Sequence, residues 1–482
     1  MNFGFAAFVL GRLCFAYVAL LVLPLGAAMV VDKSYILTFA GSMVVPLLLG
    51  TILYWHGRLY ERRLQVKDAV FVVGAGWLSI CVLGMLPYVI GMPQLSLVSC
   101  FFESTSMWTT TGATTIADLT ALPVCFTVYR TLGHWCGAVG VILIFSLLMP
   151  KVRSGVDFIL GAEMPGRGVE RTMPTVKASV LVILTIFVVM NVAAVLLFLV
   201  GGLGLWESVN MAMATVATGG LSFFRNGVVQ MPNHFLQLVC LIFMVLGAVN
   251  FTLWFKLWHR DWQGLKEDVE HRYFLGILVI AGMAVAVNMW LQGTHGFAGS
   301  LLRGFLMCIS CATTTGMVFD DINAWSGFGQ LVLILLMFVG GCSASAAGGI
   351  KIIRWVIVVK VLMAGLRRLL HPNMVTQITY GNRVLDENMV ESVVRFFFLY
   401  FSMFVILALA VAFGGVPVLD SFSLTASCMS STGCALGEVG RQGFGILSNW
   451  SKLMAALAML FGRLEFITLL ALLRPEFWTK EQ

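Results

Sequence analysis

Charged side chains are scarce in this sequence. Asp, Glu, Lys and Arg make up 11% of the 482 residues, whereas a soluble domain has about 25%. Hydrophobic residues make up 59%, with 36 Phe and 13 Trp among them, more than a water-soluble chain of this length could bury. The composition excludes an ordinary soluble domain and predicts an all-α membrane protein that crosses the bilayer many times.

Signatures of catalysis and of cofactor binding are also missing. The sequence has no phosphate-cradling Gly-Lys-Ser/Thr loop and no dinucleotide-binding glycine pattern, so nucleotide control would have to come from a partner. The seven His form no metal-binding set, and the 11 Cys, mostly inside apolar segments, indicate packing and no disulfide framework. We expect no enzyme and no bound cofactor. A receptor that transports nothing, or an intramembrane enzyme, is a remote alternative.

Long apolar segments divide the chain into spans. The first is too long for the core of a cleaved signal peptide, so we expect it to be retained. Ten spans are expected, at residues 5–31, 35–55, 69–90, 125–148, 178–200, 236–254, 274–291, 327 onward, 394–413 and 454–473. The even number places both termini on one side of the membrane.

Basic residues indicate which side that is. They cluster in the links on the side of the termini, and an excess of Lys and Arg is typical of cytoplasmic loops. The residues are Arg58, Arg62, Arg63, Lys67, Lys151, Arg153, Arg167, Arg171, Lys177, Arg260, Lys266, Arg272, Arg367, Arg368 and Arg383. We therefore expect cytoplasmic termini, and membrane orientation explains the net charge of +7 better than a nucleic-acid partner does.

A Thr-Gly turn occurs four times, each time after a short apolar helix. The turns surround Gly112, Gly219, Gly316 and Gly433, and the short helices are expected at residues 96–109, 206–216, 297–312 and 419–429. These helices are too short to span the membrane and must re-enter it. A single Thr-Gly could be an ordinary helix cap. Four at similar spacing favour a shared aqueous path with pseudo-fourfold, channel-like repeats.

The repeats give the domain boundaries. Residues 1–67 hold two leading spans, and the four span, short helix and span units are residues 68–150, 151–258, 259–366 and 367–482. In each unit the turn can aim backbone carbonyls at one axis, since Gly adopts backbone angles that other residues avoid, and Thr hydroxyls can add oxygens. The negative end of each short helix would also favour a cation.

Several strings resemble one family. They are Phe-Phe-Glu-Ser at 101–104, Thr-Thr-Thr-Gly-Ala-Thr-Thr at 109–115, Ala-Glu-Met-Pro-Gly at 162–166, Gly-Gly-Cys at 340–342, Gly-Gly-Ile-Lys at 348–351, His-Pro-Asn at 371–373, Gly-Asn-Arg at 381–383 and Phe-Gly-Arg-Leu-Glu at 461–465. Together they resemble the Trk/Ktr/HKT superfamily of potassium transporters, specifically its bacterial TrkH-type potassium uptake subunits. The resemblance covers nearly the whole chain.

The resemblance implies potassium uptake across the bacterial inner membrane by a homodimer with one pore per subunit. It also implies a cytoplasmic nucleotide-binding regulatory ring of the TrkA type, and it associates glycine at all four filter positions with potassium preference. The expected filter residues, which would bind K⁺ as the transported ion, are Thr110, Thr111, Gly112, Ala217, Thr218, Gly219, Thr314, Thr315, Gly316, Ser431, Thr432 and Gly433. Sodium-coupled or sodium-permeable transport is the alternative, and proton coupling, sodium coupling and channel-like flow all stay open.

A run of small residues interrupts the second long helix of the third repeat. Its residues are Gly340, Gly341, Cys342, Ser343, Ala344, Ser345, Ala346, Ala347, Gly348 and Gly349. The run predicts a loop within the pore, and the resemblance implies that it is an intramembrane gate. Ala344, Ala346 and Ala347 stand where Gly or Thr is common in the family, which predicts a stiffer loop. A seam of closely packed helices is the alternative.

Three charged residues lie at unusual depth. Arg463, inside the last expected span, costs at least about 2.5 kcal/mol unless it meets water or a partner. We expect it to face the pore and repel K⁺, and a structural bond to carbonyls is the alternative. Glu103 and Glu207, in the first two short helices, are expected to hydrogen-bond the filter backbone, with proton coupling as a weaker option.

Overall fold

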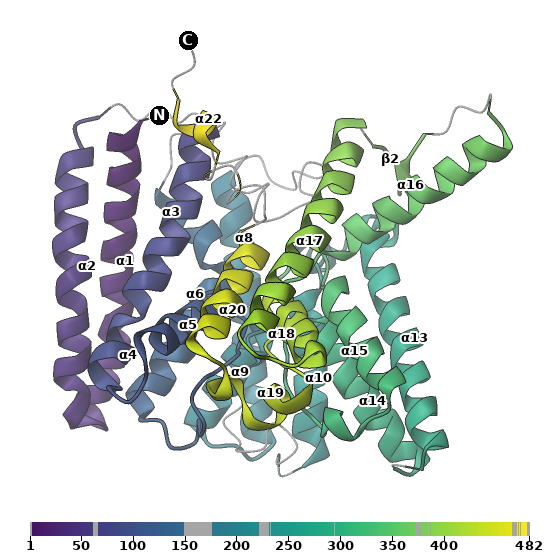
Figure 1. Cartoon of the computed structure of the whole chain (residues 1–482), viewed down its shortest axis with the longest axis horizontal. Helices are drawn as coiled ribbons and strands as arrows, with labels where there is room; N and C mark the ends of the chain where they lie inside the picture. The colour runs from purple at the N-terminus through teal and green to yellow at the C-terminus, as the bar shows by residue number, and fades with distance from the viewer. Residues whose placement is uncertain are drawn as a thin grey trace.

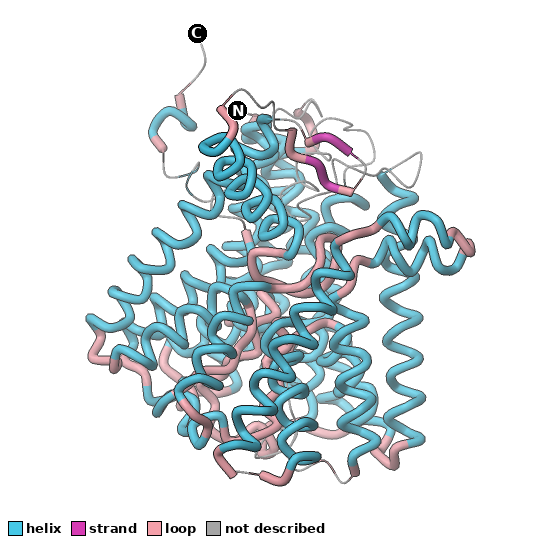
Figure 2. Tube along the Cα trace, turned by 90° about the vertical axis from the view of Figure 1, so that its right-hand side faces the viewer, coloured by secondary structure: helices cyan, strands magenta, loops and turns pink. Residues whose placement is uncertain are grey.

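The structure is a computed structural model, and it describes residues 2–60, 66–148, 176–220, 231, 233–293, 295–372, 377–381, 383–385, 387–464, 470, 472 and 474–479. Most of the basic link between the first and second repeats, including residues 162–166, lies outside this range, as do Arg62, Arg63 and residue 465. Loop segments run through the interior of the helical bundle, where a soluble bundle would have only packed helices (Figure 2).

Six helical stretches among the described residues are long and apolar enough to cross a membrane. They are α1 (Phe3–Val30), η1 with α2 (Lys33–Tyr35 and Ile36–Gly57), α3 with α4 (Val66–Gly84 and Leu86–Gly91), α8 (Val176–Val200), α13 (Glu270–Leu291) and α17 (Glu387–Phe413). Another long helix, α6, covers Val124–Leu148. The ends of these helices differ from the expected apolar segments by at most four residues, except that α17 begins seven residues before residue 394.

Four short helices also form where the sequence predicts them. They are α5 (Leu97–Trp108), α9 (Leu205–Val216), α14 (Phe297–Ala312) and α18 (Val418–Ser430). The first begins at a conventional cap, since the Ser96 hydroxyl accepts a hydrogen bond from the Ser99 amide at 3.1 Å. Each packs against the long helix that follows it in its own repeat, and each ends at a Thr-Gly turn.

Two of the expected continuous segments are broken. The apolar stretch 236–254 is predicted as one span, but α10 (His234–Ala248) and α11 (Phe251–Trp258) meet at an angle of 95°. The segment that begins at residue 327 forms α15 (Gly327–Val339), then a loop, then α16 (Ile352–Leu370). In the fourth repeat, α20 covers Asn449–Arg463 and so includes the first part of the expected span 454–473, most of whose remaining residues lie outside the described range.

Small elements complete the fold at its edges. The helices α12 (Trp262–Glu267), α19 (Gly437–Gln442) and α22 (Pro475–Trp478), with η4 (Ile322–Ala324) and η5 (Phe444–Ile446), lie in connections or at the end of the chain. After α16, β1 (Thr379–Tyr380) and β2 (Arg383–Val384) pair antiparallel. The all-α prediction therefore misses one short hairpin.

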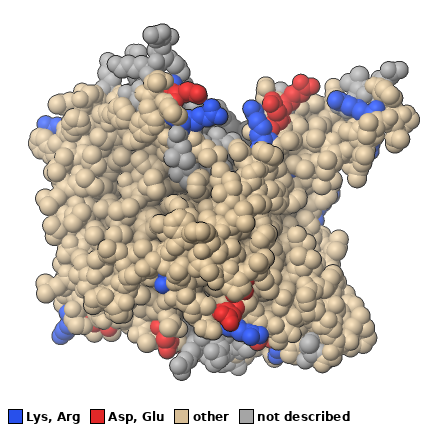
Figure 3. All heavy atoms as spheres, in the orientation of Figure 1, with Lys and Arg blue, Asp and Glu red and all other residues tan. Residues whose placement is uncertain are grey.

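The two ends of the described chain lie on the same side of the bundle. Figure 1 shows the start of α1 and the helix α22 at the top, on the side where α16 ends and α17 begins. On the face drawn in Figure 3, charged side chains gather at two opposite edges and the band between them is almost free of them. An uncharged band of this kind suits the hydrocarbon core of a bilayer.

Candidate functional site

The four turns share one backbone conformation. Each contains a residue with positive φ one or two residues after the end of its helix: Thr110 (57°), Thr218 (51°), Thr314 (54°) and Ser431 (58°). Two residues later comes a glycine with positive φ: Gly112 (77°), Gly220 (66°), Gly316 (73°) and Gly433 (84°). Since residues other than glycine adopt this region at a cost, the recurrence shows one turn built four times.

One hydrogen bond fixes the register of the turns. The amide between the two positive-φ residues donates to a carbonyl five residues earlier in each repeat. These bonds are Thr111 N to Ser106 O (2.9 Å), Gly219 N to Ala214 O (2.8 Å), Thr315 N to Ser310 O (3.0 Å) and Thr432 N to Ser427 O (2.9 Å). Gly219 therefore corresponds to Thr111, and Gly220 corresponds to Gly112.

The sequence-based assignment of the second turn is wrong by one residue. It places Gly219 with Gly112, Gly316 and Gly433, but the structure gives that position to Gly220. Ala217 and Thr218 correspond to Thr109 and Thr110. The error has a simple origin, because the chain offers two adjacent glycines here and only the backbone angles reveal which of them takes the left-handed conformation.

The turns meet in a closed ring. A Cβ added to Gly112 would collide with the carbonyl oxygen of Gly219, and the other three glycines meet the next turn in the same way. The contacts run from Gly220 to the Thr315 carbonyl, from Gly316 to the Thr432 carbonyl and from Gly433 to the Thr111 carbonyl. The order of contacts is first to second to third to fourth to first, so four carbonyl groups lie around one axis.

Side-chain hydroxyls brace three of the four turns. The hydroxyl oxygens of Thr109 and Thr111 lie 2.8 Å apart, those of Thr313 and Thr315 also 2.8 Å, and those of Ser430 and Thr432 2.6 Å. Thr109 and Thr313 also bond to carbonyls of their own helices, each at 2.7 Å. The second turn has no such pair, since Ala217 and Gly219 carry no hydroxyl.

Glu103 holds the chain that leaves the first turn. Its carboxylate accepts hydrogen bonds from the Thr115 amide, from the Thr115 hydroxyl at 2.8 Å and from the Thr114 hydroxyl at 2.9 Å. It also forms an ion pair with Arg130 of α6, and both side chains are buried. The expected bond between Glu103 and the backbone around the turn is confirmed.

The corresponding prediction for Glu207 is wrong. Its carboxylate is exposed and accepts a hydrogen bond from the Gly204 amide at 3.2 Å, at the start of α9. Glu207 is the third residue of that helix, a position from which a carboxylate reaches back to cap free amides. The residue stands at the far end of the short helix from the turn.

We expect Glu103→Ala to destabilise the folded protein strongly. The substitution leaves Arg130 buried without its carboxylate, and breaking a buried ion pair costs about 3–5 kcal/mol. Thermal unfolding of the purified protein in detergent measures the effect. The control is Glu391→Ala, because Glu391 and Arg395 form an exposed pair at 3.8 Å. Equal melting temperatures for the two variants would contradict this role for Glu103.

The small-residue run forms a loop without helical structure beside the ring. Gly340 ends α15 with φ 71°, and Lys351, with φ 78°, precedes α16. The loop fills the break between α10 and α11, where the amides of Cys342 and Ala346 donate to the carbonyls of Ala248 (2.8 Å) and Gly247 (3.1 Å). These bonds satisfy carbonyls that the bend leaves unpaired, so the loop and the bend stabilise each other.

The loop also contacts the ring directly. The Gly348 amide donates to the Thr314 hydroxyl at 2.7 Å. A Cβ on Gly348 would collide with the carbonyl oxygen of Ser430 and lie 3.1 Å from Cβ of Ser431. The loop therefore touches the third and fourth turns at once, and it cannot move without breaking a bond to the ring.

Glu270 is a functional candidate that the sequence interpretation missed. From the first residue of α13 its carboxylate reaches both ends of the loop. One oxygen accepts from the Ser343 amide (2.7 Å) and the Ile353 amide (3.1 Å), and the other accepts from the Ser343 hydroxyl (2.6 Å). Its position just before an apolar span, where acidic residues are ordinary, hides it in the sequence.

Comparison with known proteins supports a transport function. The TrkH family, described as cation transport proteins, matches residues 37–479. The chain belongs to the TrkH family of cation transport proteins. The family consists of transporters and not of enzymes. The expected resemblance is thereby confirmed.

Curated relatives and a solved structure agree with the TrkH assignment over the full length. The Trk system potassium uptake proteins TrkH of Salmonella typhimurium and Escherichia coli K12 are each 30% identical over 482 residues, covering 99% of this chain and 100% of theirs. The crystal structure of the potassium transporter TrkH from Vibrio parahaemolyticus matches with a TM-score of 0.89 at 27% identity. It covers 99% of this chain and 100% of that one.

Arg463 of this TrkH-family chain binds carbonyls behind the first turn. Its guanidinium donates to the carbonyls of Gly137 at 2.6 Å and Ala138 at 3.3 Å, both in α6. The bond between Arg463 and backbone carbonyls, which the sequence analysis gives as the alternative role of this residue, is therefore present. The Lys351 ammonium donates to the Ala347 carbonyl within the loop. Two positive charges thus lie near the ring on the loop side.

Proposed function

We propose that this protein carries potassium into a bacterial cell across the inner membrane, through the ring of four turns. The observation that carries the proposal is the closed order of contacts that brings the carbonyls of Thr111, Gly219, Thr315 and Thr432 together. Rings of backbone carbonyls replace the hydration shell of a potassium ion. The negative ends of α5, α9, α14 and α18 point to the same place and favour a cation.

The proposed topology has ten crossings and four re-entrant helices. Residues 1–67 form the leading pair, and the four repeats are residues 68–150, 151–258, 259–366 and 367–482, with both termini in the cytoplasm. The start of α1 and the helix α22 lie on the same side of the bundle (Figure 1). The exposed Arg367 and Arg368 at the end of α16 lie on that side too, and basic residues are typical of the cytoplasmic side.

The loop from Gly340 to Gly349 is the proposed gate. It lies against the third and fourth turns and is fastened by Glu270 and by the bend between α10 and α11. The charges of Lys351 and Arg463 on the same side of the ring would repel a permeating cation. Opening requires the loop to leave these partners.

A homodimer and a cytoplasmic nucleotide-binding partner of the TrkA type complete the proposal. The family resemblance implies both, and the naming of the curated relatives as proteins of a Trk system supports the partner. The partner would supply the nucleotide control for which this chain has no phosphate-binding loop. Mass measurement of the detergent-solubilised protein tests the dimer. Flux with and without the co-purified partner, in ATP, ADP or NAD, tests the control.

Uptake of rubidium into vesicles that contain the purified protein tests the function. We expect uptake driven by a negative inside potential, competed by K⁺ much better than by Na⁺. Equal competition by the two ions would favour the sodium-permeable alternative, and a dependence of K⁺ flux on a sodium or proton gradient at fixed voltage would show coupling. Vesicles that take up no rubidium under any gating condition would contradict the proposal.

A further inference from the structure

The second turn lacks the side chain that braces the other three. Between its two positive-φ residues, each of the other turns has a threonine: Thr111, Thr315 or Thr432. The hydroxyl of each threonine is paired with the hydroxyl of the residue two positions earlier. The second turn has Gly219 there. Its backbone is free of both the hydroxyl bond and the restriction that a side chain imposes, yet its carbonyl takes the same place in the ring as the other three.

His134 of α6 occupies the space behind Gly219. A Cβ on Gly219 would lie 2.8 Å from Nδ1, 3.0 Å from Cγ and 3.2 Å from Cβ of His134. The imidazole is completely buried, and neither ring nitrogen has a hydrogen-bond partner within the part of the chain that the structure describes. Burying an unpaired polar ring costs free energy, so packing against the turn must offset that cost.

The same position recurs in the other repeats, with a different residue. His134 lies three residues before Gly137, and Met244, Met337 and Met459 lie three residues before Gly247, Gly340 and Gly462. All four side chains are buried. In three repeats this glycine is packed against a backbone carbonyl at the end of the short helix. A Cβ added to the glycine would collide with that carbonyl oxygen, and the pairs are Gly137 with Trp108, Gly247 with Val216, and Gly462 with Met429.

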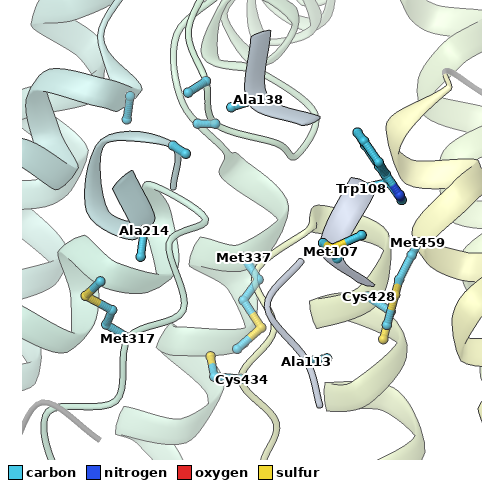
Figure 4. Close-up of a cluster of buried hydrophobic side chains, with 14 of the residues drawn as sticks. Met107, Trp108, Ala113, Ala138, Ala214, Met317, Met337, Cys428, Cys434 and Met459 are labelled. Atoms are coloured by element: carbon cyan, nitrogen blue, oxygen red, sulfur yellow. The ribbon is translucent and has the colours of Figure 1, made fainter. Parts of the chain in front are cut away.

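His134 contacts the turn of the next repeat at Gly219. By the pseudo-fourfold order of the ring, the equivalent positions hold Met244 and Thr315, Met337 and Thr432, and Met459 and Thr111. Figure 4 shows Met337 and Met459 in one buried cluster with Met107, Ala113 and Cys434 from the first and fourth repeats. Three quarters of the ring thus combine Met with Thr, and one combines a rigid imidazole with a residue that has no side chain.

We propose that His134 is a positioning residue that sets ion selectivity by holding the Gly219 carbonyl in the ring. This inference rests on the proposed potassium function and adds a residue to it. The imidazole fills the volume that a threonine would occupy and restricts a glycine that would otherwise move. Because the ring selects among ions by the placement of its carbonyls, a loose second quarter would lower selectivity more than it lowers total flux.

A double-mutant cycle tests the proposal. His134→Met alone removes the support, and Gly219→Thr alone drives a side chain into the imidazole. We expect each single variant to lower the preference for K⁺ over Na⁺ by about tenfold, the size of a strong pairwise coupling. The double variant recreates the Met and Thr combination of the other quarters, and we expect it to return to within about threefold of the wild-type preference.

The measurement is the K⁺ to Na⁺ competition ratio for rubidium uptake in vesicles, with thermal unfolding of each variant measured in parallel. His234→Met is the matched control, because that ring is exposed and lies 3.2 Å from Gln237 of its own helix. If the variants with His134→Met or Gly219→Thr do not yield monodisperse protein, the cycle is repeated with the smaller substitutions His134→Ala and Gly219→Ser.

The outcomes separate this inference from the function on which it rests. Single variants with wild-type selectivity, or effects that simply add in the double variant, would overturn the role of His134 while potassium transport by the wild type stands. A change in melting temperature without a change in the ion ratio would also overturn it. Wild-type protein that transports no potassium would instead refute the proposed function.

Discussion

Gly316→Ala is expected to abolish potassium-selective transport. The residue has φ 73°, a conformation that costs an alanine about 1–2 kcal/mol. Its added Cβ would also collide with the carbonyl of Thr432, one of the four groups in the ring. Both effects displace the carbonyl from the axis, so rubidium uptake should fall at least about tenfold or lose its preference for K⁺ over Na⁺.

Gly276→Ala is the control for this substitution. Gly276 lies in α13 with an ordinary helical backbone, and nothing lies within 4 Å of a Cβ added there. Alanine is favoured over glycine inside a helix, so this variant should fold and transport like the wild type. Uptake and ion preference that are equal in Gly316→Ala and Gly276→Ala would contradict a filter at the ring.

Glu270→Gln is expected to open the gate without the regulatory partner. The carboxylate accepts three hydrogen bonds from Ser343 and Ile353, at the two ends of the loop. The amide carries no charge, so its one acceptor oxygen holds the two backbone amides more weakly, and the bond to the Ser343 hydroxyl must reverse its direction. Charge-assisted hydrogen bonds are worth about 1.5–3 kcal/mol each. If the closed loop loses about 1.4 kcal/mol of this stabilisation, the open population and with it basal rubidium uptake rise about tenfold.

The control for the gate is Glu387→Gln, an exposed residue in the first turn of α17. It changes the same charge on the same side of the bundle without touching the loop. Basal uptake measured without partner and nucleotide should stay at the wild-type level in this variant. Unchanged or lower basal uptake in a correctly folded Glu270→Gln protein would show that Glu270 does not hold the gate closed.

The turns and their helices could be predicted because their signal is local. Each turn combines a short apolar helix with a Thr-Gly pair, and the four copies support one another. The register of the second turn could not be predicted, because Gly219 and Gly220 are equivalent in the sequence and differ only in φ. The spacing of 107 residues to Gly112 gave no basis for choosing between neighbours.

The missed features depend on contacts between distant parts of the chain. The 95° bend after Ala248 is stabilised by amides of the loop, about a hundred residues away, so the apolar pattern of residues 236–254 cannot reveal it. Glu270 acts on a loop that begins about seventy residues further along its own repeat, and His134 acts on the turn of the next repeat. The prediction for Glu207 fails because this residue lies at the capped start of its short helix, where its carboxylate bonds a free amide, and the turn lies at the other end.

The account predicts where a potassium ion binds, and crystals grown in rubidium or thallium salts test that claim most directly. Anomalous scattering should show an ion on the axis of the ring, coordinated by the carbonyl oxygens of Thr111, Gly219, Thr315 and Thr432. The peak should disappear when sodium replaces rubidium and in the Gly316→Ala variant. An ordered cation bound elsewhere along the pore, with none at these four carbonyls, would contradict the account.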